Sequence, residues 1–509
     1  MQLCHKTKCD IVFLEVFFMK IGFDNDKYLK LQTERILKRI KEFYNKLYIE
    51  FGGKLFDDLH ASRVLPGFAP DAKVQILQKL KDKSEIVFVI NANDIERNKI
   101  RADFSITYDM DVLRQIDCLR EVGLTVSGIV ITLFTGQPAA ITFSNRLSRR
   151  GEKVYFHKPT KGYPTDVNTI VSDEGYGANP YIETTKPLVI ITAPGPGSGK
   201  LATCLSQLYH EYKRGIKAGY AKFETFPVWN LPLNHPVNIA YEAATADLKD
   251  INMIDSFHLR AYGITAVNYN RDLEVFPVVR NILHKIVGTD KIYQSPTDMG
   301  VNMVGFAITD DEVVRKASIE EIIRRYYKAE CEYKKGTTSI ETVKRIEFLM
   351  GEWNIDPLSR KVVSVAKDLK KQTKTPAMAL ELSDGVIVTG RTKELMTNAC
   401  ACVINAIKHL TKIDDSIELI PQNMLEPVIK LKREKLGIRK AKLSLKDVLM
   451  LLSINSVTNP TVAIALSKLD DLKGCEAHTS SMLSSSDQNT LLSLGINVTS
   501  EPNYSSQSL

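Results

Sequence analysis

A glycine-rich turn between a strand and a helix constrains this chain more than any other feature. Leu188 to Ile191 is a short β-branched run typical of a buried strand, and the sequence PGPGSG, residues 194–199, ends it abruptly. Apolar residues then recur at helical spacing from Leu201 to Leu208. Glycines allow close backbone approach to an anion, and the first N–H groups of a helix point toward it. The unit therefore predicts a phosphate site formed by Gly195, Gly197, Ser198, Gly199 and Lys200.

The glycine loop matches neither of the two common nucleotide-binding fingerprints completely. A P-loop begins with glycine and carries Ser or Thr after its lysine, whereas Pro194 and Leu201 hold these positions here. The dinucleotide-binding pattern fits imperfectly, although Glu224 follows the expected strand Tyr220 to Phe223 where that fold places its ribose-binding acid. We expect a phosphorylated small molecule, with a nucleotide as the candidate cofactor. The alternative is a tight turn without a ligand.

Buried strands alternate with helices before the glycine loop. Such alternation predicts parallel pairing with right-handed crossovers, and so an α/β domain with a mostly parallel Rossmann-like or P-loop-like sheet. The carboxyl ends of the strands then share one edge, where we expect Asn91, Asn93, His157 and Lys158 to join the glycine loop. The expected strands are Ile86 to Ile90, Ile129 to Phe134 and Val154 to Phe156, and the expected helices are Met110 to Val122 and Pro138 to Arg149.

Three further segments carry expectations about structure. The spacing of apolar residues predicts one long helix from Asp24 to Gly52. The polar segment Lys54 to Gly67 either lines a site or is a solvated connection in which Asp57 pairs with Arg63. The connection from His157 to Lys186 is long and lacks periodicity, which favours a lid over the crevice.

The chain is too long for a single domain. Residues 1–18 form an extension before a second plausible start at Met19. A boundary falls near Trp353 to Pro357, where the charged helical stretch ends. We divide the chain into an N-terminal extension (1–18), an α/β phosphate-binding domain (19–230), a mainly helical middle region (231–353), a smaller α+β C-terminal domain (354–497) and a mobile tail (498–509).

Candidate acid–base residues are His157, Asp255, His258 and Asp298. Asp247, Asp250, Asp255 and His258 also invite a metal interpretation, but their spacing suits helix caps and ion pairs better, so we predict no metal. Cys475 to His478 resembles part of a deaminase zinc motif, yet its partner motif is absent. We interpret that segment as a loop.

Composition limits the partners. The net charge is +8, but no basic stripe is interleaved with aromatic residues, so we expect no nucleic acid. No apolar run is long enough to span a membrane, and the eight cysteines include no C-x-x-C pair, which together indicate a cytoplasmic protein. We also expect a homo-oligomer.

Four motifs, FGGKLFDDLHASRVLPGF, ITAPGPGSGKLATCLSQLYHE, VWNLPLNHPVNIAYEAATADL and SPTDMGVNM, together resemble an uncharacterised bacterial family of about 500 residues that carries a domain of unknown function. The resemblance extends from Met19 almost to the end. It implies little about activity. Some members are labelled ATP-dependent peptidase, but this sequence has no H-E-x-x-H or G-x-S-x-G motif to support that label.

Two functions remain open from the sequence, besides an oligomeric scaffold whose glycine loop is only a turn, which the polar residues at several strand ends disfavour. The first is an enzyme that uses a nucleotide or another phosphorylated small molecule held by the glycine loop. The second is a non-catalytic metabolite-binding or regulatory protein that uses the same pocket. The missing P-loop hydroxyl, which normally contacts magnesium, keeps the second alternative open.

Overall fold

The computed structural model describes residues 21–504 except 57, 102–105, 290–291 and 439–440. The predicted N-terminal extension, residues 1–18, lies outside the described residues. The chain divides into two compact units at Glu321 and Ile322, a point inside helix α13 (Asp311–Lys334).

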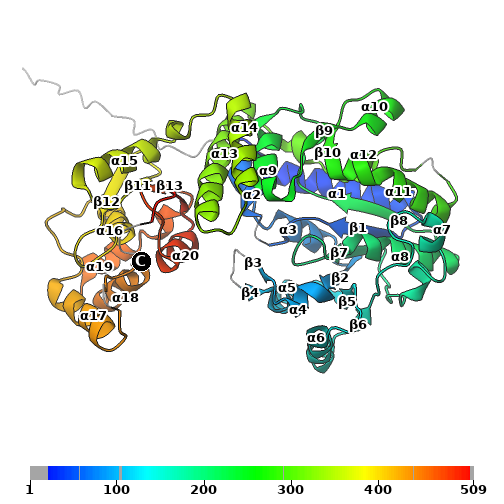
Figure 1. Ribbon diagram of the computed structural model, residues 1–509, viewed down its shortest axis with the longest axis horizontal. Helices are drawn as coiled ribbons and strands as arrows, with labels where there is room; N and C mark the ends of the chain where they lie inside the picture. The colour runs from blue at the N-terminus through cyan, green and yellow to red at the C-terminus, as the bar shows by residue number, and fades with distance from the viewer. Residues whose placement is uncertain (1–20, 57, 102–105, 290–291, 439–440, 505–509) are drawn as a thin grey trace, which may run out of the picture. The chain divides into compact units, whose positions relative to one another are not determined.

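The N-terminal unit is built on a six-stranded sheet in which every neighbouring pair is parallel. This confirms the predicted α/β class with a parallel sheet. The strand order is β6-β5-β2-β7-β1-β8, and Figure 1 shows the strands in this sequence. The strands are β1 (Leu47–Phe51), β2 (Ser84–Asn91), β5 (Val126–Thr132), β6 (Val154–Phe156), β7 (Leu188–Thr192) and β8 (Gly219–Phe223).

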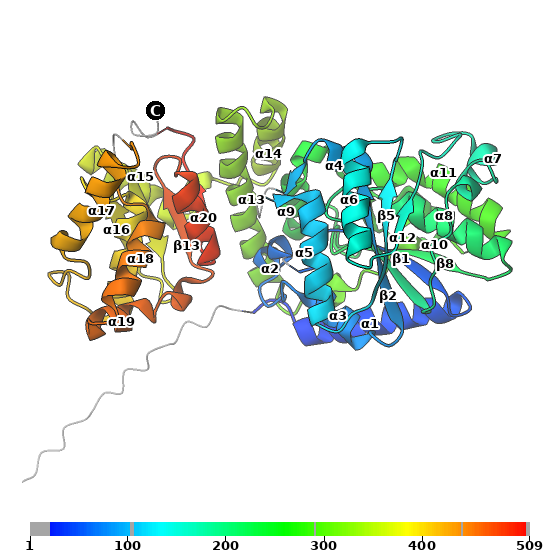
Figure 2. The same cartoon turned by 90° about the horizontal axis from the view of Figure 1, so that it is seen from below.

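Helices cover both faces of this sheet because successive strands are added first toward one edge of the sheet and then toward the other. The connections from β1 to β2, β5 and β6 run one way, and those from β6 to β7 and β8 run back. Right-handed crossovers therefore place the two sets of helices on opposite faces, as Figure 2 shows. One face carries α3 (Ala72–Lys79), α5 (Tyr108–Glu121) and α6 (Pro138–Arg149), and the other carries α8 (Lys200–Lys213) and α11 (Asn270–Val287).

The prediction of one long helix from Asp24 to Gly52 is wrong. Helix α1 (Asn25–Glu42) ends at Phe43, and Tyr44 and Asn45 adopt left-handed backbone angles that stop it. The next five residues form β1, a central strand paired with both β7 and β8. Phe43 and Leu47 continued the helical spacing by coincidence, whereas the sequence LYIEF is rich in the aromatic and β-branched residues that favour strands.

A mainly helical region follows β8 and packs along the free edge of that strand. Gly300 bridges to Lys222, and Val301 N–H donates to the Lys222 carbonyl over 3.0 Å. The region also contains a short hairpin, in which β9 pairs with β10 in antiparallel fashion. Its elements are α9 (Pro236–Ala244), β9 (Asn252–Ile254), α10 (Ser256–Tyr262), β10 (Val267–Tyr269) and α12 (Pro296–Met299), with α11 between β10 and α12.

Smaller elements complete the N-terminal unit. They are α2 (Leu59–Val64), α4 (Ala92–Glu96), the two-stranded pair β3 (Ile100–Arg101) and β4 (Ile106–Thr107), α7 (Val167–Ile170), and the 3-10 turns η1 (Tyr176–Ala178), η2 (Ala246–Leu248) and η3 (Val304–Ala307).

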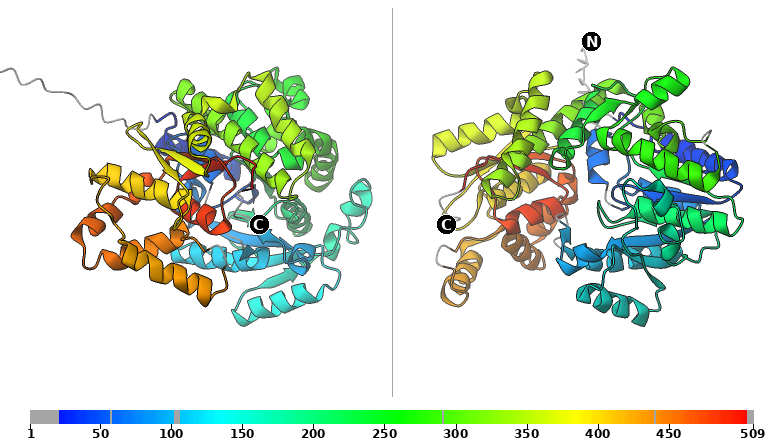
Figure 3. Two further views of the ribbon diagram at one scale, coloured as in Figure 1. Left: turned by 60° about the vertical axis from the view of Figure 1, so that its left-hand side comes forward. Right: turned by 45° about the vertical axis from the view of Figure 1, so that its right-hand side comes forward.

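The C-terminal unit surrounds a mixed sheet of order β12-β11-β13-β14 (Figure 3). Strands β11 and β12 form an antiparallel hairpin about Asp384-Gly385. The interpretation of Cys475 to His478 as a loop is wrong, because Glu476–Thr479 is strand β13, paired on both sides. Strand β14 lies in the segment that the sequence analysis places at the start of the tail. The strands are β11 (Ala377–Glu381), β12 (Ile387–Arg391), β13 (Glu476–Thr479) and β14 (Asn497–Ser500).

Helices pack on both sides of this smaller sheet. Buried apolar residues of α16 and α18, among them Val403, Ile407 and Leu452, form its main core with Met378 and Leu380 of β11. The helices are α14 (Ile340–Glu352), α15 (Lys361–Thr373), α16 (Asn398–Thr411), α17 (Gln422–Glu434), α18 (Leu445–Asn455), α19 (Pro460–Leu466) and α20 (Ser485–Ser493), with 3-10 turns η4 (Pro357–Ser359) and η5 (Asp470–Leu472).

Candidate functional site

The glycine loop leaves the sheet where the strand order reverses. From β2 the chain moves toward β6, whereas from β7 it moves toward β8, and β2 and β7 are neighbours. In open α/β sheets such a reversal separates the two crossovers and opens a crevice beyond the carboxyl ends of the strands. The loop after β7 and Asn91 at the end of β2 both lie at this point.

The backbone of the loop turns its N–H groups away from protein acceptors. Gly197 and Gly199 have φ angles of 71° and 89°, which residues other than glycine rarely adopt. The loop carbonyls are occupied: Asn91 Nδ2 donates to Gly197 O over 3.3 Å, and Thr132 Oγ1 donates to Ser198 O over 2.7 Å. None of the N–H groups of residues 197–200 donates to another residue that the structure describes. The start of α8 therefore presents a row of free donors.

Tyr108 lies directly against this loop. A Cβ added to Gly195 would lie 2.3 Å from the Tyr108 hydroxyl oxygen, so a larger residue here would have to displace the phenol. Tyr108 begins α5, and Lys99 Nζ lies 5.0 Å from the centre of its ring. The phenol thus forms one wall of the loop.

Charged side chains extend the site across the neighbouring strand ends. Lys200, the first residue of α8, lies 3.8 Å from Glu50 of β1. Lys222 of β8 pairs with Glu224 at 3.1 Å and with Asp272, in the first turn of α11, at 2.6 Å. Glu50 also accepts a hydrogen bond of 3.0 Å from the Tyr220 hydroxyl. We call Glu50, Lys200, Lys222, Glu224 and Asp272 the charged cluster.

The charged cluster shifts the proton affinity of its members. Burial raises the pKa of Glu224, and the nearby carboxylates of Asp272 and Glu50 raise it further against the lowering effect of Lys222. Burial alone lowers the pKa of Lys222, but Asp272, Glu224 and Glu50 outweigh it and raise that pKa. Lys222 is therefore a fixed cation, while Glu224 binds a proton more readily than an ordinary glutamate.

The strand order changes the expected role of Glu224. A dinucleotide-binding unit places its ribose-binding acid on the strand beside the glycine-loop strand. Here β1 lies between β7 and β8, so Glu50 occupies the neighbouring strand and Glu224 the one beyond it. Glu224 reaches back nonetheless, because a Cβ added to Gly52, at the end of β1, would lie 2.5 Å from Glu224 Cγ.

The structure brings together three of the four candidate acid–base residues, outside the charged cluster. Asp255 caps α10 and accepts from Thr297 Oγ1 over 2.6 Å. His258 Nδ1 lies 2.9 Å from Ser295 Oγ and 3.9 Å from Asp298 Oδ1. In a Ser-His-Asp triad the serine and the acid contact opposite ring nitrogens. Here both face Nδ1 and Ser295 is fully buried, so the contacts suit helix capping rather than nucleophilic catalysis.

His157 lies apart from the glycine loop. It follows β6, three strands away from β7 in the sheet, and is only 4% exposed. Burial lowers the pKa of His157 to about 4, so its ring is neutral near pH 7. A buried, neutral imidazole away from the crevice is poorly placed to contact a ligand of the loop.

The long connection after His157 does not have the contacts expected of a lid. Its residues Ile170, Tyr176 and Ile182 are buried, and it packs along the second half of α8. Tyr209 Oη donates to Asp173 over 2.7 Å, and Gln207 binds both backbone groups of Ile182. Buried apolar side chains hold this segment in place. Their spacing in the sequence follows neither a helical nor a strand period, so a search for periodicity could not predict that the segment is packed.

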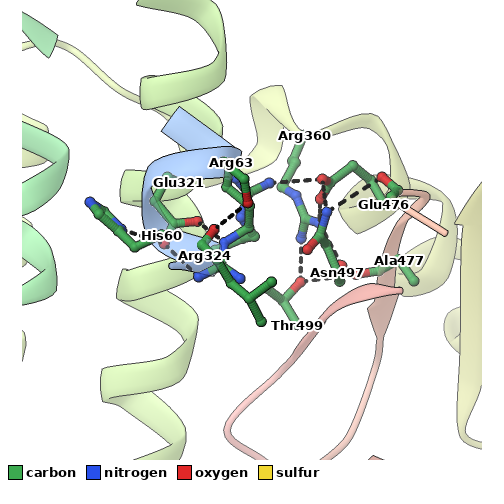
Figure 4. Close-up of polar contacts among 12 residues, drawn as sticks. His60, Arg63, Glu321, Arg324, Arg360, Glu476, Ala477, Asn497 and Thr499 are labelled. Carbon is green, nitrogen blue, oxygen red and sulfur yellow. Dashed lines mark hydrogen bonds and ion pairs between the residues drawn. The ribbon is translucent and has the colours of Figure 1, made fainter. Parts of the chain in front are cut away.

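The polar segment that begins at Lys54 is largely structural. His60 Nδ1 and Arg63 Nε lie 3.1 and 2.9 Å from the carboxylate of Glu321, which is 1% exposed (Figure 4). Lys73 Nζ binds Asp58 at 3.1 Å and the Gly52 carbonyl at 2.9 Å. Asp57, the expected partner of Arg63, lies outside the described residues.

The described residues contain no group of three or more His, Cys, Asp or Glu side chains arranged to hold a metal ion. They also contain no helix long and apolar enough to cross a bilayer.

Sequence reasoning missed Glu50, Tyr108, Lys222 and Asp272. Glu50 and Lys222 each stand in an otherwise apolar strand, in LYIEF and GYAKF, and a charged residue in a buried parallel strand is unusual. That signal could have identified both. Tyr108 and Asp272 carry no comparable signal, because aromatic and acidic residues are common at helix starts.

The fold and the loop define an α/β protein with a glycine-rich turn at the reversal of a parallel sheet. Residues 21–354 match the domain of unknown function DUF1846, N-terminal, and residues 358–509 match the corresponding C-terminal domain. The chain belongs to this family, which confirms the resemblance of the four motifs.

Close relatives cover nearly the whole chain. A UPF0371 protein of Clostridium botulinum (strain Langeland / NCTC 10281 / Type F) is 59% identical over 499 residues, which cover 96% of this chain and 99% of that protein. A UPF0371 protein of Clostridioides difficile (strain 630) has the same identity and coverage.

Proposed function

We propose that the protein is an enzyme that binds a nucleotide or another phosphorylated small molecule, with a phosphate held by residues 195–200. The observation that carries the proposal is the row of free N–H groups at the start of α8, beside Lys200. Backbone donors and the positive end of a helix stabilise an anion together, and Lys200 adds a charge. The reversal of strand order puts this row where such folds bind ligands.

Glu224 supports an enzyme rather than a passive binder. Its raised pKa, caused by burial and by Asp272 and Glu50, brings its proton affinity closer to neutral pH. Acid–base catalysis works best when the pKa of the catalytic group lies near the working pH. In the proposed enzyme, Glu224 transfers the proton while Lys200 and Lys222 neutralise developing negative charge.

One observation favours the non-catalytic alternative. Leu201 occupies the position where a P-loop carries the hydroxyl that contacts magnesium. A regulatory protein could bind the same phosphate without that ion. Turnover of a bound ligand, followed by phosphorus NMR, separates the two: conversion supports the enzyme, and ligand recovered unchanged supports the binder.

The free thiols suit the cytoplasmic location that we also propose. The described cysteines, residues 118, 204, 331, 400, 402 and 475, form no disulfide with one another. A reducing compartment keeps thiols in this state.

Replacing Lys200 by alanine is expected to weaken phosphate binding about tenfold, a loss of about 1.4 kcal/mol. The lysine supplies the only side-chain charge in the loop itself. Isothermal titration with inorganic phosphate, pyrophosphate and ADP measures the effect.

Lys213→Ala is the matched control. Lys213 ends the same helix, pairs with the exposed Asp173 and is 53% exposed. It should leave the affinities unchanged. If none of the three probes binds, or if Lys200→Ala and Lys213→Ala behave alike, the proposed phosphate site is wrong.

A further inference from the structure

The far side of the charged cluster, formed by Lys222, Glu224 and Asp272, lies about one ligand length from the glycine loop. The ends of β7, β1 and β8 lie side by side, and neighbouring strands are about 4.8 Å apart. A phosphate on the loop after β7 is therefore about 10 Å from the end of β8. Because Glu224 lies against the backbone of Gly52, its carboxylate extends over the end of β1 and shortens this gap.

The chemistry of the cluster suits hydroxyl groups. Glu50, Glu224 and Asp272 offer carboxylate oxygens that only accept hydrogen bonds, while Lys200 and Lys222 offer only donors. A hydroxyl both donates and accepts, so vicinal hydroxyls can bind a carboxylate and an ammonium at once. An apolar group would remove water from these partly buried ion pairs without adding a hydrogen bond. A second phosphate would meet three carboxylates and be repelled.

A buried phenol lies close to the charged cluster. Tyr269 is 2% exposed, and its hydroxyl is a hydrogen-bond neighbour of the Tyr241 hydroxyl. Tyr269 caps α11, three residues before Asp272, and its ring stacks on Tyr241 at 5.7 Å. Burial raises the pKa of Tyr269, and the Tyr241 hydroxyl and the carboxylates of Glu224, Asp250 and Asp272 raise it further. The carboxylates of Glu224 and Asp272 are thus within electrostatic reach of this pair of phenols.

We propose that the ligand is a phosphate ester of a polyhydroxyl compound, whose phosphate binds the glycine loop and whose hydroxyls bind Glu224, Asp272 and Glu50. This inference rests on the proposed function and adds the class of compound. The shared chemistry is a phosphorylated sugar, which occurs free or as the ribose of a nucleotide. Lys222 completes the hydroxyl site as a donor.

Isothermal titration with four probes tests the inference. Inorganic phosphate and methyl phosphate present the phosphate alone, ribose 5-phosphate adds the hydroxyls, and AMP adds the base. We expect ribose 5-phosphate or AMP to bind at least tenfold more tightly than methyl phosphate. Tighter binding of AMP identifies the nucleotide as the source, and tighter binding of ribose 5-phosphate identifies the free sugar phosphate.

Two variants locate the effect. Glu224→Gln should reduce the preference for the hydroxyl-bearing probe over methyl phosphate at least fivefold while leaving methyl phosphate itself unchanged. Asp272→Asn is the second variant. If Glu224→Gln does not fold, Asp272→Asn should show the same loss of preference for the hydroxyl-bearing probe. Glu183→Gln is the control, because Glu183 is 70% exposed and pairs only with Lys153 among the ion pairs described. It should change neither affinity.

The outcomes separate this inference from the proposed function. If all phosphate probes bind with equal affinity and Lys200→Ala weakens them all, the hydroxyl site is wrong and the phosphate site stands. The hydroxyl site is also wrong if folded Glu224→Gln and Asp272→Asn proteins keep the full preference. If no probe binds, the phosphate site fails and the hydroxyl site fails with it.

Discussion

Replacing Arg360 by methionine is expected to destabilise the C-terminal unit by about 3 kcal/mol. Arg360 is 2% exposed, and its guanidinium binds Glu476, Thr499 and the Asn497 carbonyl (Figure 4). Removing one partner of a buried pair costs about 3–5 kcal/mol because the other charge stays buried. Arg324, 2.9 Å from the same carboxylate, remains and places the loss at the low end of that range.

The loss should shrink in acid. Burial alone raises the pKa of Glu476, but Arg324 and Arg360 hold it below its usual value. A depressed pKa contributes stability above the unfolded pKa of about 4.5, and this stability disappears as pH falls through the folded value. Without Arg360 the pKa of Glu476 rises, so wild type and variant should differ less at pH 4 than at pH 7.

Urea unfolding measures the effect in a Trp229→Phe background, where Trp353 is the remaining tryptophan and lies in the C-terminal unit. Arg391→Met is the control, because Arg391 is exposed at the end of β12 and its loss should cost less than about 0.5 kcal/mol. Equal losses for the two variants would show that the buried arginine does not hold the sheet to its helices.

The parallel sheet was predictable because its strands are buried on both faces. Runs such as Ile86 to Ile90 and Leu188 to Ile191 are almost purely apolar, and helices of clear period separate them. Strand β1 escaped prediction because one charged residue, Glu50, breaks its apolar run, and because the spacing of α1 continues through Phe43 into Leu47. Glu50, which made β1 hard to predict, is also a member of the charged cluster.

The site was predictable only where local sequence determines it. The glycines and Lys200 belong to one contiguous turn, so their roles follow from backbone geometry. Glu50, Lys222 and Asp272 meet only because β1 inserts between β7 and β8 and because α11 packs beside α8. Strand order of this kind depends on long-range pairing, which no short motif encodes. The same reason explains why His157 follows a strand of the same sheet yet lies three strands from the loop, because β6 is the edge strand.

Replacing Lys222 by methionine is expected to destabilise the N-terminal unit by about 3 kcal/mol at pH 7.5. The substitution leaves Glu224, Asp272 and Glu50 close together without their shared cation. This loss of stability lies at the lower end of the range of about 3–5 kcal/mol for breaking a buried ion pair. The side chains of Glu224 and Asp272 are still 28% and 22% exposed to water.

The same variant should recover stability as pH falls. The folded pKa of Glu224 is already raised by burial, Asp272 and Glu50, and removing Lys222 raises it further. A raised carboxyl pKa contributes stability that is complete below the unfolded value of about 4.5 and is lost as pH rises through the folded value. The deficit of Lys222→Met relative to wild type should therefore be smaller at pH 5 than at pH 7.5.

Urea unfolding in a Trp353→Phe background reports this unit through Trp229, and Lys213→Met serves as the exposed control with an expected loss below about 0.5 kcal/mol. A deficit that is equal at both pH values would mean that water already screens the three carboxylates from one another. In that case Glu224 would titrate as an ordinary glutamate, and its assignment as the proton-transfer group of the proposed enzyme would be wrong. A deficit that shrinks in acid would instead demonstrate the coupling on which that assignment depends.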